Sequence, residues 1–196
     1  MKQSIKSLKN NKVIIFPAET LHGFSCSFYS EDAINKVFKI KKRENAKQFI
    51  ILVKSFKMAQ EIAEIDDKKL EFLKKYKYWP NHLTIVFNSK SDKYKTLALR
   101  YSCSEYLSEL FKSIDFPIIS TSVNYSGEAV MTDINQIIKE FDTQVDYINP
   151  NSPSNIGKAS TIIDFTKDEL SLIRDGEVPF DKIKEDYDEF KRNYSK

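Results

Sequence analysis

An α/β fold is predicted by three features of the 196-residue sequence. Short apolar runs rich in β-branched and aromatic residues alternate with longer amphipathic stretches, which is typical of interleaved strands and helices. Hydrophobic residues make up 41% of the chain and charged residues 30%, a globular composition. The length suffices for one domain with a buried core, so we expect residues 1–196 to form a single domain.

The predicted strands are the short apolar runs, which favour extended backbone. They cover residues 13–16, 49–53, 83–87, 97–100, 117–120, 161–165 and 170–173.

The predicted helices show apolar residues at three-and-four spacing. The first begins after Ser30, which is placed to cap it, and continues through Ile34, Val37 and Phe38 to Lys41. Further helices are expected at residues 57–62, 67–75, 104–113 and 133–141. Residues 180–196 are highly charged with interspersed aromatic residues, and we expect a charged C-terminal tail or a final helix.

Charge and cysteine content exclude some classes of function. The formal net charge is +3, which by itself selects no class of ligand. Cys26 and Cys103 lack CxxC spacing and the two histidines form no HExxH pair, so no dedicated zinc site is expected. No run of eighteen apolar residues and no signal-peptide core is present, which predicts a cytoplasmic protein without a membrane segment.

Two segments near the N-terminus place polar or basic groups next to predicted core elements. In Phe16-Pro-Ala-Glu-Thr-Leu-His-Gly-Phe24, a strand leads into polar residues, including Thr20; this pattern fits a ligand site or an ordinary turn with Gly23 at positive φ. Four cations, Lys41, Lys42, Arg43 and Lys47, connect a helix to a strand. They could converge on phosphates or only offset the helix dipole.

Two later segments carry hydroxyl groups at strand ends. In residues 117–127 an apolar strand ends in Ser, Thr and Asn residues and Gly127, a pattern that could bind phosphate or Mg²⁺ or form a plain turn. Ser160 begins the strand at 161–165, and Arg174 precedes Gly176 in what could be a site or a tight turn.

In order, these pieces resemble the YrdC/TsaC family of threonylcarbamoyl-AMP synthases over about residues 13–176. Thr121-Ser-Val-Asn-Tyr-Ser-Gly127 resembles the family's Thr-Ser-Ala-Asn-x-Ser-Gly and is the strongest match. The other matching segments are Pro17-Ala-Glu-Thr-Leu-His-Gly23, Lys41-Lys-Arg43 with Lys47, Trp79-Pro-Asn-His-Leu-Thr84, Leu97-Ala-Leu-Arg100, Ser160-Thr-Ile-Ile-Asp164 and Arg174-Asp-Gly176. Departures include Ala18 for Thr and His22 for Tyr, and His82 stands near a proline position.

The resemblance implies a twisted mixed sheet with flanking helices around a basic cavity, in the short single-domain form. It also implies an enzyme that condenses L-threonine, bicarbonate or CO2 and ATP, with Mg²⁺, into threonylcarbamoyl-adenylate and pyrophosphate for tRNA modification. A downstream threonylcarbamoyl transferase and tRNA are the implied partners.

The resemblance also assigns roles to individual residues. Lys41 and Arg43 would be catalytic. Thr20, Arg100 and Ser160 would bind substrate, with Thr20 and Arg100 on the threonine and Ser160 near the nucleotide. Lys47, Ser122, Asn124 and Arg174 would bind the nucleotide. Ser122 and Asn124 are also the candidate Mg²⁺ ligands. Two alternatives stay open. One is an RNA-binding module, because the cavity that the resemblance implies is basic. The other is a divergent YrdC-like paralogue that senses a nucleotide or transfers a carbamoyl group, because Ala18 and His22 depart from the family pattern.

Overall fold

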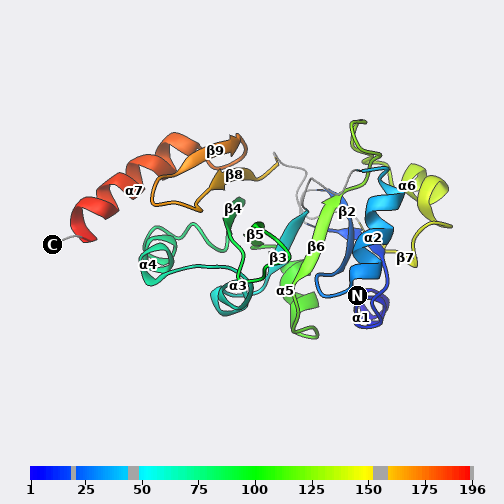
Figure 1. Cartoon of the computed structure of the whole chain (residues 1–196). Helices are drawn as coiled ribbons and strands as arrows, with labels where there is room; N and C mark the ends of the chain where they lie inside the picture. The colour runs from blue at the N-terminus through cyan, green and yellow to red at the C-terminus, as the bar shows by residue number, and fades with distance from the viewer. Residues whose placement is uncertain (19–20, 44–48, 152–158, 195–196) are drawn as a thin grey trace. The chain divides into compact units, whose positions relative to one another are not determined.

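The computed structural model describes residues 1–18, 21–43, 49–151 and 159–194. The chain divides into two compact units: residues 1–52 with 104–156 form unit 1, and residues 53–103 with 157–196 form unit 2. Each unit contains a mixed β-sheet and flanking helices, which confirms the predicted α/β class (Figure 1). The expected single domain and the basic cavity stay predictions.

Unit 1 alternates strands with helices along both of its chain segments. Its elements are α1 (Lys2–Lys9), β1 (Ile14–Pro17), β2 (His22–Ser27), α2 (Glu31–Ile40), β3 (Ile50–Val53, at the boundary of the unit), α5 (Glu105–Phe111), β6 (Ile118–Ser122), α6 (Ile134–Phe141) and β7 (Tyr147–Ile148). The strands run in the order β7-β1-β2-β6-β3, and only β1 and β7 are parallel among these pairs.

Strand β2 replaces the turn that the sequence allowed around Gly23. Gly23 lies within the strand, opposite Phe16 of β1 and Ser122 of β6. A Cβ at this position would lie 2.9 Å from Ser120 Oγ and 3.2 Å from the Thr121 carbonyl oxygen, so glycine eases the close packing between β2 and β6. The interpretation of Gly23 as a positive-φ turn residue is therefore wrong.

Helices cover both faces of the unit 1 sheet. Phe24 packs edge-on against Phe141 of α6, with ring centroids 5.0 Å apart. Phe16 lies opposite Gly23 and therefore points to the other face, where it stacks on Tyr106 of α5 at 5.6 Å. These contacts cover both faces of the sheet at β1 and β2.

Unit 2 has a smaller mixed sheet in which β4 and β8 are parallel and the other neighbours antiparallel. The strand order is β5-β4-β8-β9. Its elements are α3 (Phe56–Ile62), α4 (Asp67–Lys75), β4 (Leu83–Asn88), β5 (Thr96–Tyr101), β8 (Thr161–Asp164), β9 (Ser171–Arg174) and α7 (Phe180–Tyr194).

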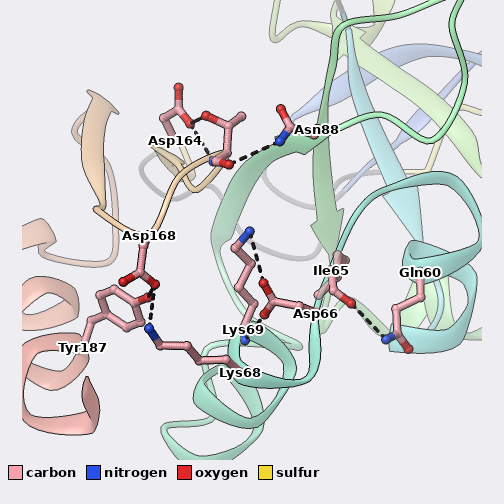
Figure 2. A network of polar contacts seen from close by, with 10 residues as sticks. Gln60, Ile65, Asp66, Lys68, Lys69, Asn88, Asp164, Asp168 and Tyr187 are labelled. Atoms are coloured by element: carbon pink, nitrogen blue, oxygen red, sulfur yellow. Dashed lines mark hydrogen bonds and ion pairs between the residues drawn. The ribbon is translucent and has the colours of Figure 1, made fainter. Parts of the chain in front are cut away.

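The C-terminal segment forms helix α7, which packs against the aromatic side chain of Phe72 on α4. Tyr187 and Phe190 lie 4.8 and 5.6 Å from the Phe72 ring centroid. Polar contacts tie the helix down as well: Lys68 and Tyr187 both donate to Asp168, at 2.6 and 2.9 Å (Figure 2). Of the two alternatives for residues 180–196, the helix is correct for residues 180–194.

A second tie involves Asp186 of α7, which is only 6% exposed. Its carboxylate accepts hydrogen bonds from the Tyr78 hydroxyl at 2.7 Å and from Lys182 Nζ at 2.6 Å. Burial, together with the Asp186 charge, raises the pKa of Tyr78, so the phenol stays protonated and donates. The helix is thus joined to the unit by an apolar face and a buried charged hydrogen bond.

All the predicted strands are present, and the structure adds α1, β2 and β7. Ser30 caps α2 by accepting from the Ala33 amide at 3.4 Å, as predicted. In the described part of the chain, no helix is both long enough and apolar enough to cross a bilayer.

Candidate functional site

A first polar cluster in unit 1 consists of Lys41, Ser122 and Asn124, and we call it the α2–β6 cluster. Lys41 is the C-cap residue of α2 and is only 2% exposed. Its Nζ donates to the Ser122 carbonyl at 2.6 Å, the Asn124 carbonyl at 2.9 Å and Asn124 Oδ1 at 2.9 Å. The end of α2 is therefore fastened to the loop that follows β6.

Both the oxygen and the nitrogen of the Asn124 side-chain amide form hydrogen bonds. Ser122 Oγ donates to Asn124 Oδ1 at 2.8 Å, and Asn124 Nδ2 donates to the Glu128 carbonyl at 2.8 Å. A backbone hydrogen bond joins the same two segments, from the Ser126 amide to the Lys41 carbonyl at 2.8 Å. The loop from Ser122 to Glu128 is thus organised around the Lys41 ammonium.

The charge state of Lys41 follows from these contacts. Burial, together with the nearby Arg43 charge, lowers the pKa of Lys41 to about 8. The three oxygens around Nζ match the three protons of an ammonium ion and would repel the lone pair of a neutral amine. At neutral pH Lys41 is a cation whose protons are all donated within the protein.

Two further cations lie next to this lysine. The Arg43 guanidinium lies over the Phe49 ring at 5.0 Å, and burial lowers its pKa. Lys42 Nζ lies over the Tyr125 ring at 4.2 Å, on the exposed side of the turn. Arg43 is the cation of this segment that we expect to face an anionic ligand, since its planar fork suits phosphate and carboxylate oxygens.

A second polar cluster in unit 2 joins the segments of Arg100, Ser160 and Arg174, and we call it the β5–β8 cluster. Arg174 Nη2 donates to the Ser160 carbonyl at 2.7 Å and contacts Ser160 Oγ at 3.2 Å. Ser160 Oγ lies 2.8 Å from Thr84 Oγ1, and Thr84 lies directly opposite Arg100 across the β4–β5 pair. Four sequence motifs therefore meet on one part of the unit 2 sheet.

Gly176 allows the segment after β9 to lie against the segment that leads into β8. A Cβ on Gly176 would lie 2.3 Å from the Thr161 amide nitrogen and 2.4 Å from the Ala159 carbonyl oxygen. No backbone tolerates such contacts, so the residue after Arg174-Asp must lack a side chain. The segment Arg174-Asp-Gly176 is therefore packed against the segment before β8, and its role in ligand binding stays a prediction.

Arg100 is the most buried cation of this cluster, with 8% of its surface exposed. Burial lowers its pKa to about 10, so the guanidinium remains charged at neutral pH. His82 Nδ1 lies 3.4 Å from Arg100 Nη2 and 2.9 Å from Glu177 Oε2. A buried cation flanked by hydroxyl groups can receive a carboxylate in a planar fork.

A family model described as "Telomere recombination", for the Sua5/YciO/YrdC domain, matches residues 6–176. The chain belongs to the Sua5/YciO/YrdC family. Both clusters lie within the matched residues, whereas helix α7 follows them.

Curated relatives and a solved structure of this family cover most of the chain. Threonylcarbamoyl-AMP synthase from Pyrococcus abyssi is 27% identical over 183 residues, which cover 90% of this chain and 54% of that protein. A putative threonylcarbamoyl-AMP synthase from Methanocaldococcus jannaschii is 30% identical over 180 residues, which cover 91% and 86%. The crystal structure of P. abyssi Sua5 complexed with L-threonine matches with a TM-score of 0.84 and 26% identity, over 94% of this chain and 56% of that one. The chain thus spans about half the length of the P. abyssi protein.

The Sua5/YciO/YrdC site residues predicted from sequence divide between the two units. Lys41, Arg43, Ser122 and Asn124 lie in unit 1, and Arg100, Ser160 and Arg174 lie in unit 2. Thr20 and Lys47 lie outside the described residues, so their predicted roles stay predictions. Sequence reasoning missed Thr84, His82 and Glu177, although Thr84 ends the Trp-Pro motif and Glu177 directly follows Arg174-Asp-Gly176.

The Mg²⁺ ion that the family implies does not fit Asn124 as a direct ligand. Asn124 Oδ1 already accepts from Ser122 Oγ and from the Lys41 ammonium, so a second cation at this oxygen would have to displace the first. No group of three or more His, Cys, Asp or Glu side chains suited to a metal occurs within the described ranges.

The His22 position, where the family has Tyr, has a clear structural role. His22 is 3% exposed, and its Nε2 lies 2.9 Å from the Asn151 carbonyl oxygen. Since a carbonyl only accepts, Nε2 carries the proton and donates. Burial lowers the pKa of His22, so the ring is neutral at physiological pH. The imidazole is therefore a buried donor to the segment after β7.

Proposed function

We propose that this protein is a threonylcarbamoyl-AMP synthase that joins L-threonine, CO2 derived from bicarbonate, and ATP into threonylcarbamoyl-adenylate, with release of pyrophosphate. The observation that carries this proposal is the similarity to Sua5 solved with L-threonine, over 94% of this chain. Curated relatives named threonylcarbamoyl-AMP synthase support the same activity.

The reaction needs positioned charges rather than a side-chain nucleophile. The threonine nitrogen forms a bond to CO2 and loses a proton, which gives a carbamate. A carbamate oxygen then bonds to the α-phosphorus while the bond from that phosphorus to the bridging oxygen breaks and pyrophosphate leaves. Negative charge gathers on the phosphate oxygens, so fixed cations and N–H groups lower the barrier.

For unit 1 we propose a phosphate-binding role. Arg43 supplies the cation, and Ser122 and Asn124 belong to the loop that offers hydroxyl and N–H groups to phosphate oxygens. Lys41 acts on this loop by holding its carbonyl oxygens, because its three protons are already donated. Mg²⁺ would arrive on the nucleotide phosphates as part of the substrate, and Lys47 stays a predicted phosphate ligand.

For unit 2 we propose that Arg100 pairs with the threonine carboxylate. Ser160 would contact the amino acid, and Arg174, which is tied to Ser160 at 2.7 Å, would contact the nucleotide. Thr20 stays a predicted threonine ligand.

We also propose that the product passes to a transferase that modifies tRNA. The product is a mixed anhydride of a carbamate and a phosphate, which hydrolyses easily, so a prompt acceptor is needed. Cytoplasmic location and direct contact with tRNA stay predictions from the sequence.

The proposal is tested by incubating the purified protein with L-threonine, bicarbonate, ATP and Mg²⁺ and measuring pyrophosphate. We expect threonine-dependent release that Arg43→Ala and Asn124→Ala lower by about 100-fold or more. Lys42→Ala is the matched control, since Lys42 is the exposed neighbour of Arg43. Pyrophosphate no greater than in a threonine-free reaction would overturn the proposal.

A separate titration with tRNA at low and high salt examines the RNA-binding alternative. Tight, salt-sensitive binding without ATP turnover would favour that alternative over the synthase.

A further inference from the structure

The guanidinium of Arg43 lies over an aromatic ring at the start of the next strand. Arg43 Cζ is 5.0 Å from the centroid of the Phe49 ring. Phe49 is 6% exposed and directly precedes β3, whose first residue, Ile50, pairs with Ser120 of β6. Phe38 of α2 packs on the same ring, with the two centroids 4.4 Å apart. The Phe49 ring therefore contacts both a helix residue and a cation within unit 1.

The backbone of Arg43 is fixed by the way in which α2 ends. The Arg43 amide donates to the Phe38 carbonyl at 3.0 Å, and the Lys42 amide donates to the Lys39 carbonyl at 3.1 Å. Lys42 has left-handed backbone, with φ at 50°. These bonds form a Schellman motif, in which the residue after the left-handed one commonly packs near the residue that accepts its amide. Here Phe49 joins those two residues, because Phe38 and Arg43 both contact its ring.

An aromatic ring holds a guanidinium without competing with an anionic ligand. The negative face of the ring attracts a cation, and the attraction is stronger where water is excluded. The ring has no oxygen, so this contact takes no hydrogen bond that a phosphate would accept. Lys41 differs in this respect, because its three protons are donated to oxygens of the protein. Contact with Phe49 thus suits a cation that binds a ligand.

We propose that Phe49 is a positioning residue: its ring, packed against Phe38, holds the Arg43 guanidinium in place for the phosphate oxygens of the nucleotide. The inference rests on the proposed function, because it takes a phosphate group as the ligand of Arg43. It assigns a role to a residue that the sequence marked only as the start of a strand.

Calorimetric titration with ATP and Mg²⁺ tests the inference. Phe49→Leu keeps an apolar side chain and removes the ring, and we expect it to weaken ATP binding about 3- to 10-fold. Phe111→Leu is the matched control, because Phe111 of α5 is 5% exposed in the same unit and the same atoms are removed. This control should bind ATP as tightly as the unaltered protein. Equal affinities of the two variants, both folded by circular dichroism, would overturn the inference.

Fluorinated phenylalanines at position 49 separate the attraction of charge from packing. Each fluorine atom draws electron density from the ring face and weakens its attraction for a cation, while the shape of the ring changes little. We expect ATP affinity to fall stepwise as one, two and three fluorine atoms are introduced. An affinity that stays constant across this series would overturn the inference. The series decides the matter even if Phe49→Leu unfolds.

The pair Arg43→Ala with Phe49→Leu shows whether the ring acts through the guanidinium. We expect this pair to bind ATP no more weakly than Arg43→Ala alone, because the ring then has no cation to hold. Additive losses from the two substitutions would overturn the inference, as would absence of ATP binding by the unaltered protein. Non-additive ATP binding without threonine-dependent pyrophosphate would support the role of Phe49 and overturn the proposed function alone.

Discussion

Replacing Lys41 by methionine is expected to loosen the loop from Ser122 to Glu128. Methionine keeps an unbranched apolar stem in a site that is 2% exposed, and it removes only the ammonium. Three oxygens then lose their donor: the carbonyls of Ser122 and Asn124, and Asn124 Oδ1. The loop would keep the bond from Ser122 Oγ to Asn124 and the backbone bond from the Ser126 amide to the carbonyl of residue 41, but it would lose the side-chain bonds to α2.

The size of the effect follows from those contacts. A hydrogen bond to a charged group contributes about 1.5–3 kcal/mol, but three bonds to one ammonium do not add, because burying the ion costs free energy. Removing one partner of a buried ionic cluster costs about 3–5 kcal/mol. We take about 3 kcal/mol for local opening of this loop, which corresponds to roughly a 100-fold change in an equilibrium constant.

Hydrogen–deuterium exchange measured by mass spectrometry checks this value. The Ser126 amide donates to the Lys41 carbonyl and the Met131 amide to the Val123 carbonyl, both at 2.8 Å, so peptides that contain them report on loop opening. We expect exchange there to be about 100-fold faster in Lys41→Met, and threonine-dependent pyrophosphate release to fall by a similar factor.

Lys42→Met is the matched control, because Lys42 is the next residue and its exposed side chain lies over the Tyr125 ring. We expect less than about 1 kcal/mol from its loss. The reasoning would be refuted if Lys41→Met exchanged at the same rate as Lys42→Met in these peptides.

Three other perturbations probe the rest of the structure. His22→Gln should reduce the acid sensitivity of the protein: the folded-state pKa of His22 lies below its unfolded value, so His22 stabilises the fold fully above about pH 6.5 and this contribution is lost as the pH falls through the folded pKa. Urea unfolding at pH 7 and pH 5 measures this as a smaller fall in the free energy of unfolding for the variant; an equal fall in both proteins would contradict it. Tyr78→Phe removes the donor to buried Asp186 and should lower the free energy of unfolding of unit 2 by about 1.5–3 kcal/mol, observed through the fluorescence of Trp79, the one tryptophan of the chain. An unchanged unfolding midpoint in Tyr78→Phe would contradict this prediction, because it would mean that water replaces the phenol as a donor to Asp186. Gly176→Ala should cost more stability than Gly127→Ala, because the first places Cβ 2.3 Å from a backbone nitrogen and the second meets nothing within 4 Å at φ +87°. Thermal melts of the two variants compare these losses of stability. Equal melting temperatures would contradict the prediction, because they would show that the backbone at Gly176 shifts to accept a Cβ.

The elements that the sequence missed have a common cause. Strand β2 reads His22-Gly-Phe-Ser-Cys-Ser27, with small and polar residues where a strand prefers large apolar ones, yet every one of its residues is buried. It is buried because β1 and β6 flank it and helices cover both faces, which are properties of the assembled unit. Helix α1 buries Ser4, Ser7 and Leu8, a face too polar to predict a helix from its periodicity.

The structure brings predicted site residues together where a motif carries its own chemistry, and their roles stay predictions. The segments that contain Lys41 and Asn124 were singled out for their cations and hydroxyl groups, and their side chains meet at 2.9 Å although they are 83 positions apart. His82 was noted only as a departure from the family pattern. Its contact with Glu177 joins residues that nothing in a linear pattern pairs.

The sequence by itself determined the α/β class, most strands and helices and the segments that supply the polar clusters, because periodicity, capping residues and motif chemistry are local properties. The tertiary structure alone decided which atoms each polar group contacts. It placed the Lys41 ammonium against three oxygens of the loop after β6, because a buried ammonium ion must donate its protons to nearby oxygens. It also brought Glu177 into contact with His82, because close packing at Gly176 holds the segment after β9 against the segment that leads into β8.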